Sequence, residues 1–166
     1  MNLPIYNVTL GEITGLSLVE FPAIEEDFQC FSKQVKFSYN EEKHIVFGPV
    51  MIPDKPIFRG GYYLVFGKEV IEEFFLDFMK NKVSDFNLEH SNKIANVFLL
   101  EAFIKRPGLN PEGYEDLPDG TLFFSLKVED DNLWSQIKSG KFRGFSIEAD
   151  ITSEQKDELE QFLDEL

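Results

Sequence analysis

The chain has 166 residues, of which 43% are hydrophobic and 14% aromatic, and a formal net charge of -14 at pH 7. This length fits one domain with a sizeable core, and 18 Phe against a single Trp predict that phenylalanine fills much of that core. The negative charge opposes the counterion release that drives nucleic-acid binding, so we expect no direct DNA or RNA partner. A single cysteine excludes an internal disulfide and a thiolate zinc site.

The two ends of the chain differ in charge. The first residues lack the basic and apolar regions of a secretory signal, and no apolar run approaches the roughly 20 residues of a membrane-spanning helix. We therefore expect a soluble, cytoplasmic protein with no membrane partner. Residues 148–166 hold eight Asp or Glu and one Lys, which is half of the net charge. Such a segment is solvated, or it faces a basic partner.

The first half of the chain is dominated by predicted strands. Alternating apolar residues predict strands over residues 3–10 and 16–22, joined as a hairpin, and a further strand over 35–39. Residues 44–52 are strongly apolar, and a Gly-Pro pair in their middle indicates a bulge or an edge strand. After a structured loop, another strand is expected over 62–66.

The second half mixes helices with strands. Apolar residues at three- and four-residue spacing predict helices over 68–80, 130–139 and 152–166. Strands are predicted over 85–90, 95–104, 121–128 and 142–151, the first two of them paired, with a long loop over 106–120.

Together these elements favour an α+β domain on a mostly antiparallel sheet, in which a barrel-like arrangement is one option. We assign residues 1–151 to the domain and 152–166 to an acidic, amphipathic terminal helix.

Nucleophilic catalysis could be assembled from Ser146, His90 and Glu148. On a strand, residues two apart share a face and lie about 6.6 Å from each other, so Ser146 and Glu148 would project together. An imidazole that bonds a serine hydroxyl through one nitrogen and a carboxylate through the other needs its partners roughly that far apart. His90, from a neighbouring strand, could lie between them.

Several alternatives stand beside this one. A Gly-x-Ser-x-Glu pattern is common by chance, and a strand serine near a carboxylate is usually a solvated polar pair. His44, the other histidine, follows charged residues and fits a surface role. Two histidines without metal-ligand spacing make a zinc centre improbable, and neither a calcium loop nor a phosphate-binding loop is present, so we expect no metal and no cofactor. Nearby candidates for oxyanion stabilisation are Lys138, Lys141, Arg143 and the backbone amides around Gly140 and Gly144.

Six ordered blocks resemble a known family. The chain is similar to the prohead (capsid maturation) serine proteases of tailed bacteriophages, whose fold is similar to that of the herpesvirus assemblins. The blocks that carry this resemblance are residues 15–27, 46–56, 88–90, 101–104, 119–121 and 140–148.

The resemblance implies a serine endopeptidase with Ser146 as the nucleophile and His90 as the general base. Such enzymes act inside the procapsid in the host cytoplasm, where they self-associate and cleave scaffold and major capsid proteins and often themselves. Assemblins use a second histidine as third member, and this chain has none after Ser146, so Glu148 is the first choice and Glu101 the alternative. The acidic terminal helix would then be a docking segment or the stub left by self-cleavage. The competing hypothesis is a non-catalytic capsid or scaffold-interaction protein that keeps the protease fold.

Overall fold

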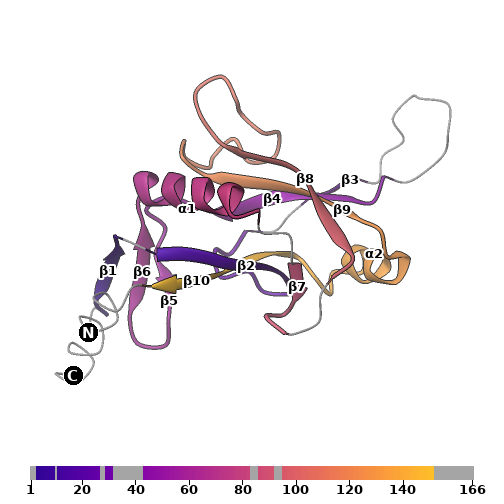
Figure 1. Ribbon diagram of the computed structural model, residues 1–166, viewed down its shortest axis with the longest axis horizontal. Helices are drawn as coiled ribbons and strands as arrows, with labels where there is room; N and C mark the ends of the chain where they lie inside the picture. Colours follow the sequence, from indigo (N-terminus) through magenta and orange to yellow (C-terminus); the bar gives the residue numbers. More distant parts are fainter. Residues whose placement is uncertain are drawn as a thin grey trace.

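The structure is a computed structural model that describes residues 3–9, 11–26, 29–31, 43–82, 86–91 and 95–151, with side chains left undescribed at 11–15, 29–31 and 148–151. The predicted strand over 35–39 and the predicted terminal helix over 152–166 lie outside these residues. The described part contains strands and two helices (Figure 1). The elements are β1 (Ile5–Val8), β2 (Gly11–Val19), β3 (Gln29–Phe31), β4 (Ile45–Met51), β5 (Ile57–Phe58), β6 (Tyr63–Phe66), α1 (Lys68–Lys80), β7 (Phe86–Leu88), β8 (Val97–Ile104), β9 (Leu122–Val128), α2 (Asp131–Lys138) and β10 (Gly144–Ile151).

The strands form three sheets, in the orders β1-β6-β5, β10-β2-β7 and β3-β4-β9-β8. Only the β1–β6 and β2–β7 pairs are parallel among the described strands, so the predicted α+β class with mostly antiparallel pairing is confirmed. The barrel-like option is wrong for the described part of the chain, because its strands belong to separate sheets and none of these closes on itself.

Two predicted strand pairings are also wrong. The segment over 3–10 does not form a hairpin with the next strand, because β1 pairs with β6 and β2 lies between β10 and β7. The predicted 85–90 and 95–104 strands do not pair with each other either. Instead β7 pairs with β2 and β8 pairs with β9. Both errors come from joining strands that are neighbours in sequence, whereas the sheets are built from distant segments.

The main core lies where α1 covers β2 and the inner strands (Figure 1). The helix buries Ile71, Phe74 and Phe78 along one face, as its spacing predicts, and Phe78 packs against Phe124 of β9 with ring centroids 5.0 Å apart. Phe74 meets Phe66 in the same way at 5.8 Å. The predicted phenylalanine-rich core is therefore confirmed.

The strand β4 is central in its sheet although it contains Pro49. Its register with β9 shifts between Pro49 and Met51, which is the irregularity that a residue without an N–H needs inside a sheet. The bulge predicted from the Gly-Pro pair is thus confirmed, and the alternative of an edge strand is wrong.

The predicted loop over 106–120 is ordered by Lys105. This lysine is 5% exposed, and its ammonium donates to the carbonyl oxygens of Tyr114 at 3.3 Å, Glu115 at 2.9 Å and Leu117. The N–H of Gly113 donates to Glu115 Oε1 at 3.0 Å, which lowers the pKa of that carboxyl below its usual value. The loop thereby covers a small aromatic cluster of Phe47, Tyr114 and Phe123.

Candidate active site

Three polar side chains form a row across the sheet β10-β2-β7. In the antiparallel β10–β2 pair Ser146 lies opposite Ser17, and in the parallel β2–β7 pair Ser17 lies opposite Asn87. Leu16 and Leu18 on either side of Ser17 are 1% exposed and point into the core. Because side chains alternate along a strand and directly opposed residues share a face, the polar row lies on the face away from those leucines.

His90 is presented by the turn that follows β7. The N–H of Ser91 donates to the Leu88 carbonyl at 3.0 Å, and the two central residues have positive φ, 51° at Glu89 and 52° at His90. These φ signs are those of a type I′ turn, which usually has Gly, Asn or Asp at its centre. Non-glycine residues in this region are strained and persist only where their surroundings hold them.

The turn is held by the end of β2. The N–H of Glu89 donates to the Leu18 carbonyl at 3.0 Å, and Glu89 Oε1 accepts from the N–H of Glu20 at 2.7 Å. The N–H of His90 donates to Ser17 Oγ at 3.2 Å. Backbone and side chain of the turn are thus both tied to the strand that separates β7 from β10.

The imidazole of His90 spans β2 and reaches Ser146. Its Nε2 lies 2.9 Å from Ser146 Oγ, and its Nδ1 lies 3.1 Å from Ser17 Oγ. Ser17 Oγ is also hydrogen-bonded to Asn87 Oδ1. The structure therefore brings two of the sequence-predicted site residues, Ser146 and His90, into hydrogen-bond contact, and it adds Ser17 and Asn87 to them.

Glu148 and Glu101, the two carboxylates predicted as the third member of the triad, lie in different sheets. Glu148 lies opposite Gly15 in the β10–β2 register, next to a register shift, and its side chain is outside the described part. Glu101 is on β8 in another sheet, where it accepts a hydrogen bond from Ser125 Oγ at 2.8 Å. The position of Glu101 gives no support to a role beside His90.

A family model described as "Putative phage serine protease XkdF" matches residues 34–155, which is most of the chain and includes both His90 and Ser146. The chain belongs to this phage serine protease family. The predicted resemblance to phage serine proteases is confirmed at that level, and the likeness to herpesvirus assemblins stays a prediction. No curated protein and no solved structure shows significant similarity to the chain.

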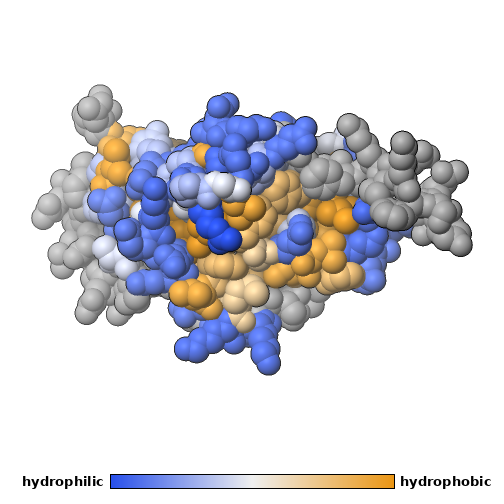
Figure 2. All heavy atoms as spheres, turned by 90° about the horizontal axis from the view of Figure 1, so that it is seen from above, coloured by the Kyte–Doolittle hydropathy of each residue, from blue (hydrophilic) through white to orange (hydrophobic). Residues whose placement is uncertain are grey.

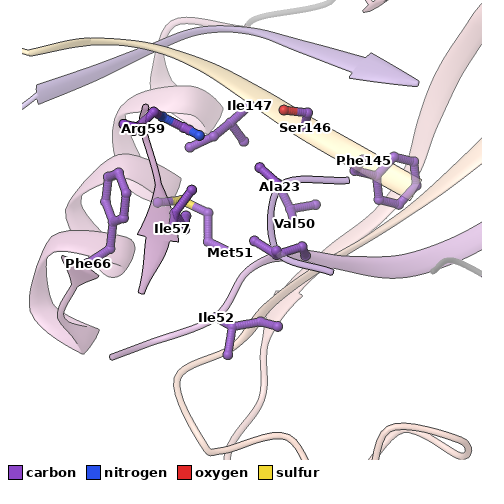
Figure 3. A pocket seen from close by; sticks show the side chains of 11 residues that line it. Ala23, Val50, Met51, Ile52, Ile57, Arg59, Phe66, Phe145, Ser146 and Ile147 are labelled. Carbon is purple, nitrogen blue, oxygen red and sulfur yellow. The ribbon is translucent and has the colours of Figure 1, made fainter. Parts of the chain in front are cut away.

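Ser146 of this phage serine protease family member lines a narrow apolar pocket. The room inside it is about 10 Å³, which is about that of one water molecule. Ser146 and Arg59 lie at one end of the ring of side chains and Ile52 at the other (Figure 3). Arg59 is the one charged residue among the described residues that line it. The full lining is Ala23, Ile24, Val50, Met51, Ile52, Ile57, Arg59, Phe66, Phe145, Ser146 and Ile147.

A wider groove adjoins this pocket and shares Ala23 with it. The groove has a volume of about 530 Å³, and its apolar walls include Phe21 and Phe58, which are 76% and 55% exposed. Acidic side chains and Arg143 also line it. The predicted cation Arg143 is thus near the site, whereas the ammonium of Lys141 lies over the ring of its own neighbour Phe142, 5.5 Å from the centroid.

The turn after β2 packs tightly against the first residue of β10. A Cβ on Gly144 would lie 2.6 Å from Pro22 Cγ and 2.9 Å from the Glu26 carbonyl oxygen. Only a glycine allows this approach, so the pocket wall around Ala23 depends on Gly144.

Within the described ranges, no group of three or more His, Cys, Asp or Glu side chains could hold a metal ion. The helices of that part are also too short or too polar to cross a bilayer.

Proposed function

We propose that the chain is a serine endopeptidase that cleaves phage scaffold and major capsid proteins, and itself, during head maturation. Ser146 is the nucleophile and His90 the general base. The observation that carries this proposal is the 2.9 Å contact between His90 Nε2 and Ser146 Oγ at the wall of an apolar pocket. Membership of the phage serine protease family supports the same chemistry.

Accessibility decides which of the two serines beside His90 attacks. Ser17 has no exposed surface, whereas Ser146 is partly exposed and lines the pocket. A substrate carbonyl can approach only the second of them. Ser146 is therefore the nucleophile, and Ser17 lies behind the imidazole.

The reaction follows from these positions. His90 Nε2 accepts the Ser146 hydroxyl proton as the oxygen attacks the scissile carbonyl, and then gives that proton to the leaving amine. A water molecule, deprotonated by the same nitrogen, hydrolyses the acyl-enzyme and restores the serine. Arg143 and the backbone amides near Gly144 remain the proposed sources of oxyanion stabilisation.

The hollows beside Ser146 support an extended peptide as the substrate. The narrow pocket suits a small apolar side chain next to the scissile bond, because nearly all of its lining is apolar. The adjoining groove of about 530 Å³ has both apolar and charged lining residues, which suits the flanking residues of a polypeptide. A protein segment fits this combination better than a small ester does.

Self-association is supported by the outer strand of the largest sheet. β8 exposes Phe98 and Leu100, and α1 exposes Leu76 and Met79, each by more than 40%. β8 lies in the upper half of Figure 1, below the 106–120 loop, and Figure 2, which views the molecule from above, shows apolar side chains gathered near the middle of that face. An exposed apolar edge of this kind favours contact with another protein chain.

The proposal has three further parts. The protease acts inside the procapsid, and residues 1–151 form the protease domain. The acidic terminal segment, residues 152–166, is a docking segment or the stub left by self-cleavage. Glu148 is kept in it as a proposed carboxylate near the site.

Co-expression with the major capsid protein of the same phage tests the proposal. We expect intact-mass measurement to find a shortened capsid protein with the wild type and the full-length one with Ser146→Ala or His90→Gln. Ser125→Ala, which removes a hydroxyl from a different sheet, is the matched control and should leave cleavage intact. Capsid protein cut equally by all four chains would overturn the assignment.

The competing function is a non-catalytic capsid or scaffold-interaction protein, which the exposed apolar residues of β8 favour. It predicts that Phe98→Ser with Leu100→Ser blocks capsid assembly while Ser146→Ala has no effect. The peptidase predicts that Ser146→Ala blocks maturation.

A further inference from the structure

We propose that β5 is the strand on which the substrate docks. An extended substrate peptide adds to the outer edge of β5, and its side chains alternate between the narrow pocket beside Ser146 and the groove beside Phe58. The inference rests on the proposed function and deepens it, because it names the conformation of the substrate and two neighbouring side chains that the site selects.

The backbone of β5 presents hydrogen-bonding groups at the edge of its sheet. Among the described strands, the order β1-β6-β5 leaves β5 with one neighbour, β6. The N–H of Arg59 donates to the Tyr62 carbonyl at 2.9 Å, so these two form a hydrogen-bonded pair. Such pairs alternate with non-hydrogen-bonded ones between antiparallel strands, and the next pair along is Phe58 with Tyr63. The N–H and C=O of Phe58 therefore point away from β6.

Two contacts agree with this direction. The N–H of Tyr63 donates to the Pro4 carbonyl at 2.9 Å, which lies on the β1 side and away from β5. The Phe58 carbonyl accepts from the exposed side chain of Arg59, whose Nη1 lies 3.2 Å away. A carbonyl oxygen has two lone pairs, so this bond does not block a substrate N–H. The outer edge of β5 thus presents the donor and the acceptor of Phe58 to an added strand.

The side chains of β5 and its flanking residues alternate between the two hollows. Ile57 and Arg59 line the narrow pocket, whereas Pro56 and Phe58 line the groove. This is the pattern of a strand, on which residues two apart share a face. Ala23 lines both hollows, so they meet at the turn after β2, and Figure 3 shows Ile57 and Ala23 on the same pocket. A chain that follows β5 can therefore place side chains in both hollows.

The alternation predicts which side chains the site selects. A substrate residue opposite Phe58 shares its face and enters the groove. The rings of Phe58 and Tyr63 lie 5.5 Å apart there, and with the exposed Phe21 they suit a large apolar side chain. The next substrate residue points to the other face, toward the narrow pocket with Ser146, where only a small side chain fits. The site therefore selects a small apolar residue beside a large apolar one.

The test compares two rates for each full chain. One is cleavage of the major capsid protein of the same phage, and the other is labelling by a fluorescent fluorophosphonate, which reacts with an activated serine and has no peptide to dock. Phe58→Pro removes the outward N–H at an edge position, where a sheet tolerates proline. We expect it to lower the ratio of cleavage to labelling by about 10- to 100-fold, because one hydrogen bond to the substrate is lost.

Ile5→Pro is the matched control on the opposite edge of the same sheet. Ile5 is 60% exposed and lies opposite Tyr63 in the parallel β1–β6 pair. Tyr63 donates to the Pro4 carbonyl, so the backbone groups of Ile5 point outward as those of Phe58 do. We expect the ratio of Ile5→Pro to equal that of the wild type. Phe58→Leu keeps the N–H and should lower the ratio less than Phe58→Pro does.

Amide hydrogen exchange gives a readout that needs no cleavage, and it carries the test if Phe58→Pro does not fold. The Ser146→Ala chain is mixed with the capsid protein, and exchange is resolved to single residues. We expect the Phe58 amide to exchange at least about 10-fold more slowly with the capsid protein than without it, because a paired N–H is protected. The Ile5 amide should exchange at the same rate in both samples.

The inference is overturned if the capsid protein leaves exchange at Phe58 unchanged, or if Phe58→Pro has the wild-type ratio. Slow exchange at Phe58 in the Ser146→Ala chain alone would assign the edge to another segment of the same chain or, if it depends on concentration, to a second copy, and it also overturns the inference. Cut sites without a small apolar residue beside a large one contradict the predicted selection.

The two proposals can fail separately. A wild type that neither labels nor cleaves, while the capsid protein slows exchange at Phe58, would overturn the peptidase and support β5 as the docking strand. A wild type that labels and cleaves, with a Phe58 amide that the capsid protein does not protect, would support the peptidase and overturn the docking strand.

Discussion

Ser125 and Ser146 are strand serines that lie beside hydrogen-bonding side chains, and only Ser146 is placed for nucleophilic chemistry. Ser125 donates to Glu101 at 2.8 Å, whereas Ser146 faces a histidine nitrogen at 2.9 Å. Both line a hollow, because Ser125 and Glu101 border a groove of about 500 Å³ under the 106–120 loop. The two serines differ in their hydrogen-bond partner. Ser125 faces a carboxylate, whereas Ser146 faces an imidazole, which can take the serine proton and then give it to the leaving group.

The comparison also explains why a serine and a nearby carboxylate were a weak signal in sequence. Ser125 with Glu101 has those parts, yet Ser125 is only 3% exposed and no imidazole adjoins it among the described contacts. At Ser146 the distinguishing parts come from two other strands and a strained turn.

The largest effect should come from the histidines. We expect His90→Gln to reduce fluorophosphonate labelling by at least about 10³-fold, because Ser146 then has no base. His44→Gln is the matched control, since His44 stacks on Trp134 with centroids 4.8 Å apart, far along the chain from Ser146. An equal loss of labelling in both variants would mean that the substitutions damage the fold in general, and it would contradict the role of His90 as the base.

The loop beside Ser125 should matter for stability and not for labelling. Lys105→Met removes the ammonium that donates to the carbonyls of Tyr114, Glu115 and Leu117 and should lower the free energy of unfolding by about 2 kcal/mol. Denaturant unfolding measures this, and the labelling rate of the folded variant should stay near that of the wild type. A more stable variant would show that desolvation of the ammonium outweighs its hydrogen bonds.

We expect Gly144→Ala to disturb the packing beside Ser146. Its Cβ would force back Pro22 and the Glu26 carbonyl, at an expected cost of about 1–3 kcal/mol and with slower cleavage. Gly61→Ala is the control, because a Cβ there meets nothing within 4 Å. Thermal unfolding of the two variants checks this, and equal midpoints would contradict the close packing at Gly144.

The smallest effect is expected from Ser125→Ala. It removes one hydrogen bond to Glu101 and should cost about 1 kcal/mol of unfolding free energy, without a change in labelling rate. A large fall in labelling would indicate that Ser125, and not Ser146, is the reactive serine.

Local pattern was sufficient for parts of the fold. The three- and four-residue spacing of α1 predicted its buried face, because a helix repeats within one segment, and the Gly-Pro pair predicted the bulge in β4. Strand pairing could not be derived in the same way. Nothing local in residues 3–22 shows that β1 joins β6 or that β10 and β7 flank β2.

The candidate site, too, could be predicted only in part from the sequence. His90 stood out because the chain has only two histidines, and Ser146 stood out because of the carboxylate two residues after it and the resemblance of its block to phage proteases. Ser17 did not, since a single serine between two leucines is ordinary in a strand, and its partner Asn87 is 70 residues away. The short strand β7 and the positive φ at Glu89 and His90 gave no recognisable turn signal, because neither residue is a usual choice there. Lys105 was missed because lysine is rarely buried.

The most direct test of the central claim is to map the residue that the fluorophosphonate modifies. Trypsin releases residues 144–156 as one peptide, and its fragment ions separate Ser146 from Ser153. We expect an adduct on Ser146 in the wild type and none in His90→Gln. An adduct on Ser17, Ser125 or Ser153, or on Ser146 irrespective of His90, would contradict it.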